Sequence, residues 1–193
     1  EPLVELHPLD AEEHGIDERD LVRVVTPQGE SVFRAAIVAS QRRGEIFVPI
    51  HWSSEFASDA RVGALVNPIV DPISGEPEHK HTPARVMPFV VSWHGFILSR
   101  TRIADTHVVW WTLVRGAQFL RYEIAGRRMV DDWSAWARSL FGETSPDADW
   151  IEYLDRGAGV YRGALLVDDR MSACVFVSPR PDLPSRTWLS SLF

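Results

Sequence analysis

The spacing of apolar residues in the first part of the chain predicts a short helix followed by a β-hairpin. A helix is expected from Pro8 and should stop at Gly15, because proline suits a first helical turn and glycine favours the conformation that ends one. Apolar residues then recur over 21–25 and 32–38, on either side of a turn that contains Gly29. This pattern is typical of two antiparallel strands joined by a glycine-containing loop.

A further strand and a long loop are predicted after this hairpin. The continuous apolar run 46–50 suits a strand covered on both faces, with Pro49 at its end or on a sheet edge. From 53 to 83 turn signals replace regular periodicity, and ordered loops of this length are usually functional. Apolar residues along it predict an ordered, packed segment: Val62, Leu65, Val66, Ile69 and Val70. We therefore interpret 53–83 as a binding loop.

Beyond residue 88 the sequence predicts a second module, in which seven of the eight tryptophans lie. Strands are expected over 89–98, 107–114 and 118–124, a hairpin over 160–167 and 172–177, and a short helix from about Ser185. Another helix, capped by Asp131 or Asp132, should bury a stripe of residues at helical spacing. The stripe consists of Trp133, Trp136, Ala137, Leu140 and Phe141.

Composition and charge narrow the classes of partner. The 193 residues carry a net charge of −7 and their basic residues are scattered, so we expect neither nucleic acid nor an anionic lipid surface as partner. No apolar stretch approaches the roughly 20 residues that a membrane span needs. Cys174 is the single cysteine and lies in an apolar run, which predicts a buried thiol, no disulfide and a cytoplasmic location.

Standard catalytic motifs are absent from the sequence. It has no glycine-rich phosphate loop, Cys-x-x-Cys pair, Gly-x-Ser-x-Gly elbow or His-Glu-x-x-His helix. His79 and His81, with His51 elsewhere, lack the acidic or thiolate companions of a metal site, so no metal site is predicted. The tryptophans of the second half follow helical or alternating spacing, which favours core packing over a surface that stacks bases.

Residues around the long loop suit a nucleotide or pterin ligand. His51 and Trp52 follow the expected strand 46–50, Asn67 lies inside the loop and Lys80 lies near its end. A pterin or purine needs a flat apolar surface and an amide for its ring edge, and a pyrophosphate needs a cation. The alternative is that Trp52 belongs to the core, Asn67 satisfies a turn and Lys80 is solvated. The spacing does not decide between them.

Motifs in the same region carry a likeness to a known family. They are Gly44-Glu45-Ile46-Phe47-Val48-Pro49-Ile50-His51-Trp52, Ala64-Leu65-Val66-Asn67, Asp71-Pro72-Ile73-Ser74-Gly75 and Pro77-Glu78-His79-Lys80. Further matching stretches are 5–11, 15–16, 20–24, 95–100, 173–177 and 183–189. Together and in this order they resemble the C-terminal region of the molybdopterin oxidoreductases, the dimethyl sulfoxide reductase family. The likeness is strongest to assimilatory nitrate reductase.

The resemblance implies a mainly β protein with an α+β part. Residues 1–88 would form a six-stranded double-psi β-barrel that binds bis(molybdopterin guanine dinucleotide), and 89–193 a smaller α+β accessory module of unassigned role. It assigns cofactor contacts to His51, Trp52, Asn67, Lys80 and His81. The family's molybdenum ligand, iron–sulfur cysteines and a further barrel strand belong to upstream domains. The chain also begins without methionine, so we expect a segment of a longer protein that is inactive alone.

For the parent protein, the resemblance implies reduction of nitrate to nitrite, with electrons delivered through iron–sulfur clusters. The implied partners are the upstream domains of the same polypeptide and an electron-donor protein or domain. Two alternatives stay open. One is the same domain of a formate dehydrogenase or another molybdopterin oxidoreductase. The other is a non-catalytic module that docks an electron donor through its tryptophan-rich half.

Overall fold

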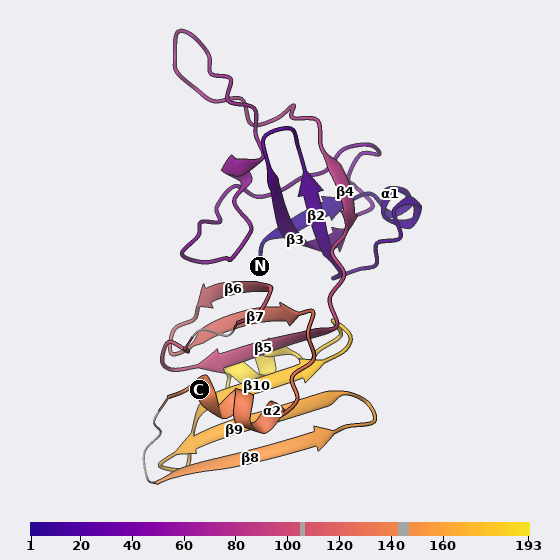
Figure 1. The fold of residues 1–193 in the computed structure, drawn as a ribbon. Helices are drawn as coiled ribbons and strands as arrows, with labels where there is room; N and C mark the ends of the chain where they lie inside the picture. The colour runs from indigo at the N-terminus through magenta and orange to yellow at the C-terminus, as the bar shows by residue number, and fades with distance from the viewer. Residues whose placement is uncertain (105–106, 143–146) are drawn as a thin grey trace. The chain divides into compact units, whose positions relative to one another are not determined.

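The computed structural model describes residues 1–104, 107–142 and 147–193, and these form two compact units. The units are Glu1–Val90 and Val91–Phe193, so the division lies two residues from the expected boundary at 88 (Figure 1). Strands make up most of the regular secondary structure in both units, and the helices are few and short. The expected mainly β class is thereby confirmed.

The N-terminal unit contains a four-stranded sheet with the order β1-β3-β2-β4. Its strands are β1 (Leu3–Leu6), β2 (Leu21–Val25), β3 (Glu30–Ile37) and β4 (Arg85–Pro88). The antiparallel pair β2–β3 confirms the predicted hairpin, whereas β1, parallel to β3, and β4 were not predicted. Within residues 1–90, all of which are described, β1 and β4 do not pair with each other, so this sheet is open. The six-stranded double-psi barrel therefore stays a prediction.

Burial alternates along β1, whereas residues 31–35 of β3 are all buried. Val4, Val22 and Phe33 are fully buried and form one apolar cluster. The predicted helix is confirmed as α1 (Pro8–Glu13), which places Ala11 in that cluster. Gly15 ends it with a φ of 63°, a conformation that a residue with a side chain rarely adopts.

The strand predicted over 46–50 does not form. Only an isolated bridge joins Phe47 to Glu5, and the side chains of Phe47 and Ile50 are 52% and 56% exposed. Pro49 lacks the N–H that a continuing ladder needs, which explains why the pairing stops after one bridge. The run therefore pairs with the backbone of β1 at a single point, while Ile46 and Val48 pack against the apolar cluster.

The C-terminal unit is an antiparallel six-stranded sheet with the order β6-β7-β5-β10-β9-β8. Its strands are β5 (Trp93–Ser99), β6 (Trp110–Arg115), β7 (Leu120–Gly126), β8 (Ala148–Asp155), β9 (Val160–Val167) and β10 (Arg170–Ser178). The first three begin two to four residues later than predicted, and β8 was not predicted. The hairpin β9–β10 is confirmed. Its turn residues Asp168 and Asp169 have φ values of 50° and 58°, as a type I′ turn requires.

Two short helices, α2 (Trp133–Ser139) and α3 (Arg186–Ser190), belong to this unit. Asp132 caps α2 as predicted, since its carboxylate accepts the Ala135 N–H at 3.0 Å. The buried stripe is narrower than predicted. Trp133, Ala137 and Leu140 are buried, but Trp136 and Phe141 are only partly so, and Phe141 lies beyond the end of the helix at Ser139.

The interior of the C-terminal unit also holds the single thiol. Cys174 is buried on β10, and burial raises the pKa of its thiol to about 12, so the predicted buried thiol is confirmed. Among the described residues, no helix has the length and apolar character needed to cross a bilayer.

Candidate functional site

The five predicted site residues all lie in the N-terminal unit, but the structure gathers only three of them. Asn67, Lys80 and His81 lie around the base of one hairpin-like segment, 69–78 (Figure 1). Trp52 is half-buried and packs against the apolar cluster of this unit, while His51 is exposed. In the described part of the chain, no hydrogen bond or ring contact joins these two residues to the other three.

Backbone hydrogen bonds close the hairpin segment 69–78. The Glu78 N–H donates to the Ile69 carbonyl at 2.9 Å, and Val70 and Pro77 form an isolated antiparallel bridge. Below them, the Asn67 N–H donates to the Thr82 hydroxyl oxygen at 3.2 Å. Residues 67 and 80 are far apart in sequence, so this closure is what brings them to one place.

The tip of the hairpin is ordered by one carboxylate. An oxygen of Asp71 accepts the N–H groups of Ile73 and Ser74 at 2.9 and 2.7 Å. These donors, with the Ser74 hydroxyl, hold the pKa of the Asp71 carboxyl below its usual value. The predicted apolar packing of the loop is only partly correct. Val62 and Leu65 are buried and Val66 packs against the apolar cluster, but Ile69 and Val70 are exposed.

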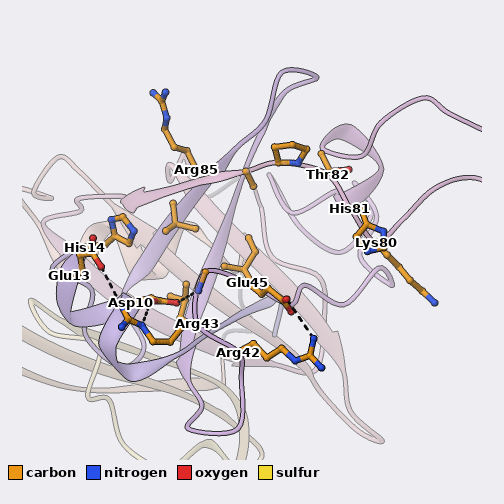
Figure 2. Close-up of a pocket in the computed structure, with 16 residues that line it drawn as sticks. Asp10, Glu13, His14, Arg42, Arg43, Glu45, Lys80, His81, Thr82 and Arg85 are labelled. Atoms are coloured by element: carbon orange, nitrogen blue, oxygen red, sulfur yellow. Dashed lines mark hydrogen bonds and ion pairs between the residues drawn. The ribbon is translucent and has the colours of Figure 1, made fainter.

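Glu78 organises the residues that follow the hairpin. One of its carboxylate oxygens accepts the Lys80 backbone N–H at 2.5 Å, and the other lies 3.6 Å from Nδ1 of His81. The Lys80 N–H is the main reason why the pKa of Glu78 is lowered. The side chains of Lys80 and His81 are exposed, and Figure 2 shows the Lys80 ammonium directed away from the carboxylates of Asp10, Glu13 and Glu45.

Lys80 and His81 also line a cavity of about 1000 Å³ between α1, the loop 42–46 and the segment 80–86 (Figure 2). His51, Trp52 and Asn67 are not part of its lining. The charged and imidazole side chains around it are Asp10, Glu13, His14, Arg42, Arg43, Glu45, Lys80, His81 and Arg85.

The basic side chains of the loop 42–46 pair with carboxylates, whereas the lysine and arginine of the segment 80–86 do not in the described residues. Arg43 donates from Nε to Asp10 at 3.2 Å, and Arg42 lies 3.8 Å from Glu45. The Gly44 N–H donates to Asp10 at 2.7 Å and is the main cause of the lowered pKa of Asp10. Within the described residues, neither Lys80 nor Arg85 has a carboxylate partner. Capacity to bind an anion therefore lies along 80–86.

Sequence reasoning missed the arginines of this cavity. The residue pattern assigned no role to Arg42, Arg43 or Arg85. For Arg42 and Arg43 the signal in the sequence is a basic pair followed by Gly44, a residue that favours a surface turn. No group of three or more His, Cys, Asp or Glu side chains in the described ranges is placed to hold a metal ion.

Comparison with known families decides the kind of domain. The family described as Molydopterin dinucleotide binding domain matches residues 1–83. The N-terminal unit belongs to the family of molybdopterin dinucleotide-binding domains. Domains of this kind occur in both nitrate reductases and formate dehydrogenases.

Three curated proteins contain regions similar to this chain. A nitrate reductase of Klebsiella oxytoca is 34% identical over 133 residues, which are 69% of this chain and 15% of that protein. F420-dependent formate dehydrogenase 1 subunit alpha of Methanococcus maripaludis is 38% identical over 86 residues, 45% of this chain and 12% of that protein. The assimilatory nitrate reductase catalytic subunit of Bacillus subtilis is 32% identical over 88 residues, 46% and 12% respectively. The chain thus spans 12–15% of the length of these relatives.

Proposed function

We propose that this chain is the cofactor-binding C-terminal portion of a molybdenum-dependent nitrate reductase, which reduces nitrate to nitrite. The supporting observation is the extent of the likeness. The 133 residues aligned with the Klebsiella oxytoca nitrate reductase exceed the 90 residues of the N-terminal unit, so they include part of the C-terminal unit. The 86 residues aligned with the formate dehydrogenase are fewer than the 90 of the N-terminal unit, as are the 88 aligned with the Bacillus subtilis nitrate reductase.

The residues of the N-terminal unit fit a molybdopterin guanine dinucleotide. When bound, the cofactor supplies the oxygen-atom transfer, and the chain binds and orients it. Lys80 and Arg85, which have no carboxylate partner in the described residues, match the charge of its phosphates. The Asn67 side-chain amide suits the edge of a pterin or guanine ring. His51, Trp52 and His81 complete the contacts that we propose for the two dinucleotides.

The open sheet of the N-terminal unit fits a larger barrel in the parent. The outer edge of β4 presents N–H and C=O groups that another strand can pair with, and so does the outer edge of β1 apart from Glu5, which bridges to Phe47. We infer that other segments of the same polypeptide complete a double-psi barrel there. We place the molybdenum ligand and the iron–sulfur clusters in upstream domains as well. An electron donor supplies the clusters, and we propose that the enzyme acts in the cytoplasm.

The substrate is tested on the purified parent enzyme. We expect nitrate reduction driven by reduced methyl viologen, and no formate oxidation with the oxidised dye. Formate oxidation without nitrate reduction would replace nitrate reductase by the formate dehydrogenase alternative. The 193-residue chain alone should show neither activity, because its one cysteine is buried and leaves no ligands for a cluster. Viologen-driven activity of that chain would contradict this assignment of roles.

One observation favours the docking alternative for the C-terminal unit. Ile151 and Tyr153 point to the same face of the edge strand β8 and are 62% and 55% exposed. We propose this face as a contact for the electron donor. Ile151→Glu should weaken reduction of the parent by its donor while the dye-driven rate is unchanged. Equal donor-driven rates in the wild type and in Ile151→Glu would show that Ile151 does not contact the electron donor.

A further inference from the structure

Two side chains at the base of the hairpin 69–78 hold the candidate cofactor residues in place without belonging to that set. The Thr82 hydroxyl oxygen accepts the Asn67 N–H at 3.2 Å, and Glu78 accepts the Lys80 N–H at 2.5 Å. We propose that Thr82 and Glu78 are positioning residues, which fix Asn67 opposite Lys80 and His81 so that one cofactor meets all three. This inference rests on the proposed function.

The hydrogen bond from the Asn67 N–H to the Thr82 hydroxyl oxygen closes the base of the hairpin 69–78. Backbone bonds between the two arms of the hairpin end at Ile69 and Glu78. No backbone hydrogen bond joins Asn67 to 79–82 in the described residues, so the Thr82 hydroxyl extends the closure beyond the last backbone pair. Threonine suits this task because its branched side chain has few rotamers, which fixes the oxygen relative to the backbone.

Glu78 acts on the other arm through a single carboxylate. One oxygen fixes the backbone at Lys80, and the other lies 3.6 Å from the His81 imidazole. The Lys80 side chain is long and exposed, so the direction of its backbone determines where its ammonium can reach. Without this contact, Lys80 and His81 would sample more orientations, and binding the cofactor would cost more conformational entropy.

The test uses the parent enzyme loaded with cofactor. Thr82→Val removes the acceptor and keeps the shape, and we expect cofactor to be lost roughly 3 to 10 times faster than from the wild type. Molybdenum per polypeptide, followed during dialysis, gives this rate. Thr82→Ser restores the hydroxyl and should retain cofactor as the wild type does. Thr26→Val is the matched control, because its hydroxyl accepts the Gln28 N–H at 3.2 Å in another turn of the same unit.

A second measurement separates positioning from cofactor contact. Amide exchange at Asn67 in the cofactor-free parent should be faster in Thr82→Val than in Thr26→Val. Faster exchange with unchanged molybdenum retention would overturn the positioning role alone. A wild-type parent that holds no molybdenum would overturn the proposed function and this inference with it. Should Thr82→Val fail to fold, Glu78→Ala should lose cofactor faster, and Glu78→Gln, which keeps an acceptor for Lys80, should recover most of the retention.

Discussion

The two units of the chain reach an ordered structure by different means. In the C-terminal unit six strands pair along most of their length. In the N-terminal unit four strands pair, and 38–84 contains one short 3₁₀ helix, Val62–Ala64. There, side chains bond to the backbone in place of a ladder, as Asp10 does at Gly44 and Thr82 at Asn67. Loops held on a rigid sheet are where binding residues commonly lie.

This difference separates stability from binding. Substitutions in the C-terminal core should change the free energy of unfolding and leave the candidate site intact. Substitutions in 67–82 should change cofactor binding and have little effect on unfolding. The following experiments test that separation.

The largest loss of stability is expected from Trp133→Ala. Trp133 is buried, contacts Trp93 edge-on with ring centroids 5.1 Å apart, and stacks on Tyr161. Removing it should destabilise the C-terminal unit by about 3–5 kcal/mol. Denaturant unfolding followed by tryptophan fluorescence reports this unit, where seven of the eight tryptophans lie. Trp136→Ala is the matched variant and should cost less, since Trp136 is only half-buried. Equal losses of unfolding free energy in the two variants would contradict the finding that Trp136 is less buried than Trp133.

A buried ion pair should give the next largest effect. Arg186 donates to both carboxylate oxygens of Glu123, at 3.0 and 2.6 Å, and lies over the Phe96 ring. Glu123 is 2% exposed, so Arg186→Met leaves a buried charge with Arg121 at 3.8 Å as its remaining ion-pair partner. We expect a loss of about 3 kcal/mol. The double variant Arg186→Met, Glu123→Gln should recover part of it. A double variant less stable than Arg186→Met would refute this explanation.

The sequence predicted the C-terminal unit better than the N-terminal one, and the reason is physical. Hairpin strands such as β9 and β10 are apolar-rich runs on either side of a short turn at Asp168 and Asp169, and each pairs with its neighbours along most of its length. The run 46–50 has the same apolar character but meets β1 only at Phe47, where Pro49 ends the pairing. The residue types of a segment do not show whether it will find a neighbouring strand to pair with.

The candidate site shows the same limit. Residue types and the family likeness pointed to Asn67, Lys80 and His81, which the hairpin gathers. Neither indicated Thr82, because its contact depends on how the chain returns after the hairpin. The roles of His51 and Trp52 stay predictions. Trp52 packs against the apolar cluster, as the core alternative for that residue supposed.

Asn67→Ala in the parent enzyme tests whether a change in the candidate site lowers cofactor binding more than stability. The substitution keeps the backbone N–H that Thr82 accepts and removes only the side-chain amide. A lost hydrogen bond to a buried ring should weaken cofactor binding by about 1–3 kcal/mol, with a smaller change in unfolding. Molybdenum content per polypeptide, measured beside the melting temperature, distinguishes the two effects. Gln28→Ala, at an exposed amide in the β2–β3 turn, is the control. Unchanged molybdenum content would make Asn67 a turn residue.

The smallest effect concerns pH and is confined to the hairpin 69–78. The pKa values of Asp71 and Glu78 are lowered from 3.8 and 4.5 because backbone N–H groups donate to their charged forms. A lowered pKa stabilises the fold above the unfolded value and loses this contribution as the pH falls through the folded pKa. The contribution of each carboxylate is therefore complete above its unfolded value, 4.5 for Glu78 and 3.8 for Asp71, and the hairpin should loosen as the pH falls through the lower folded pKa values. Amide exchange at Ile73 and Ser74, corrected for its intrinsic pH dependence, measures the loosening of the hairpin tip, while the amides of β9 should stay protected.

The control is Asp71→Asn, which keeps an acceptor without the charge, so the acid-induced loosening at the tip should disappear. A tip that loosens equally in this variant would show that the carboxylate is not what orders it.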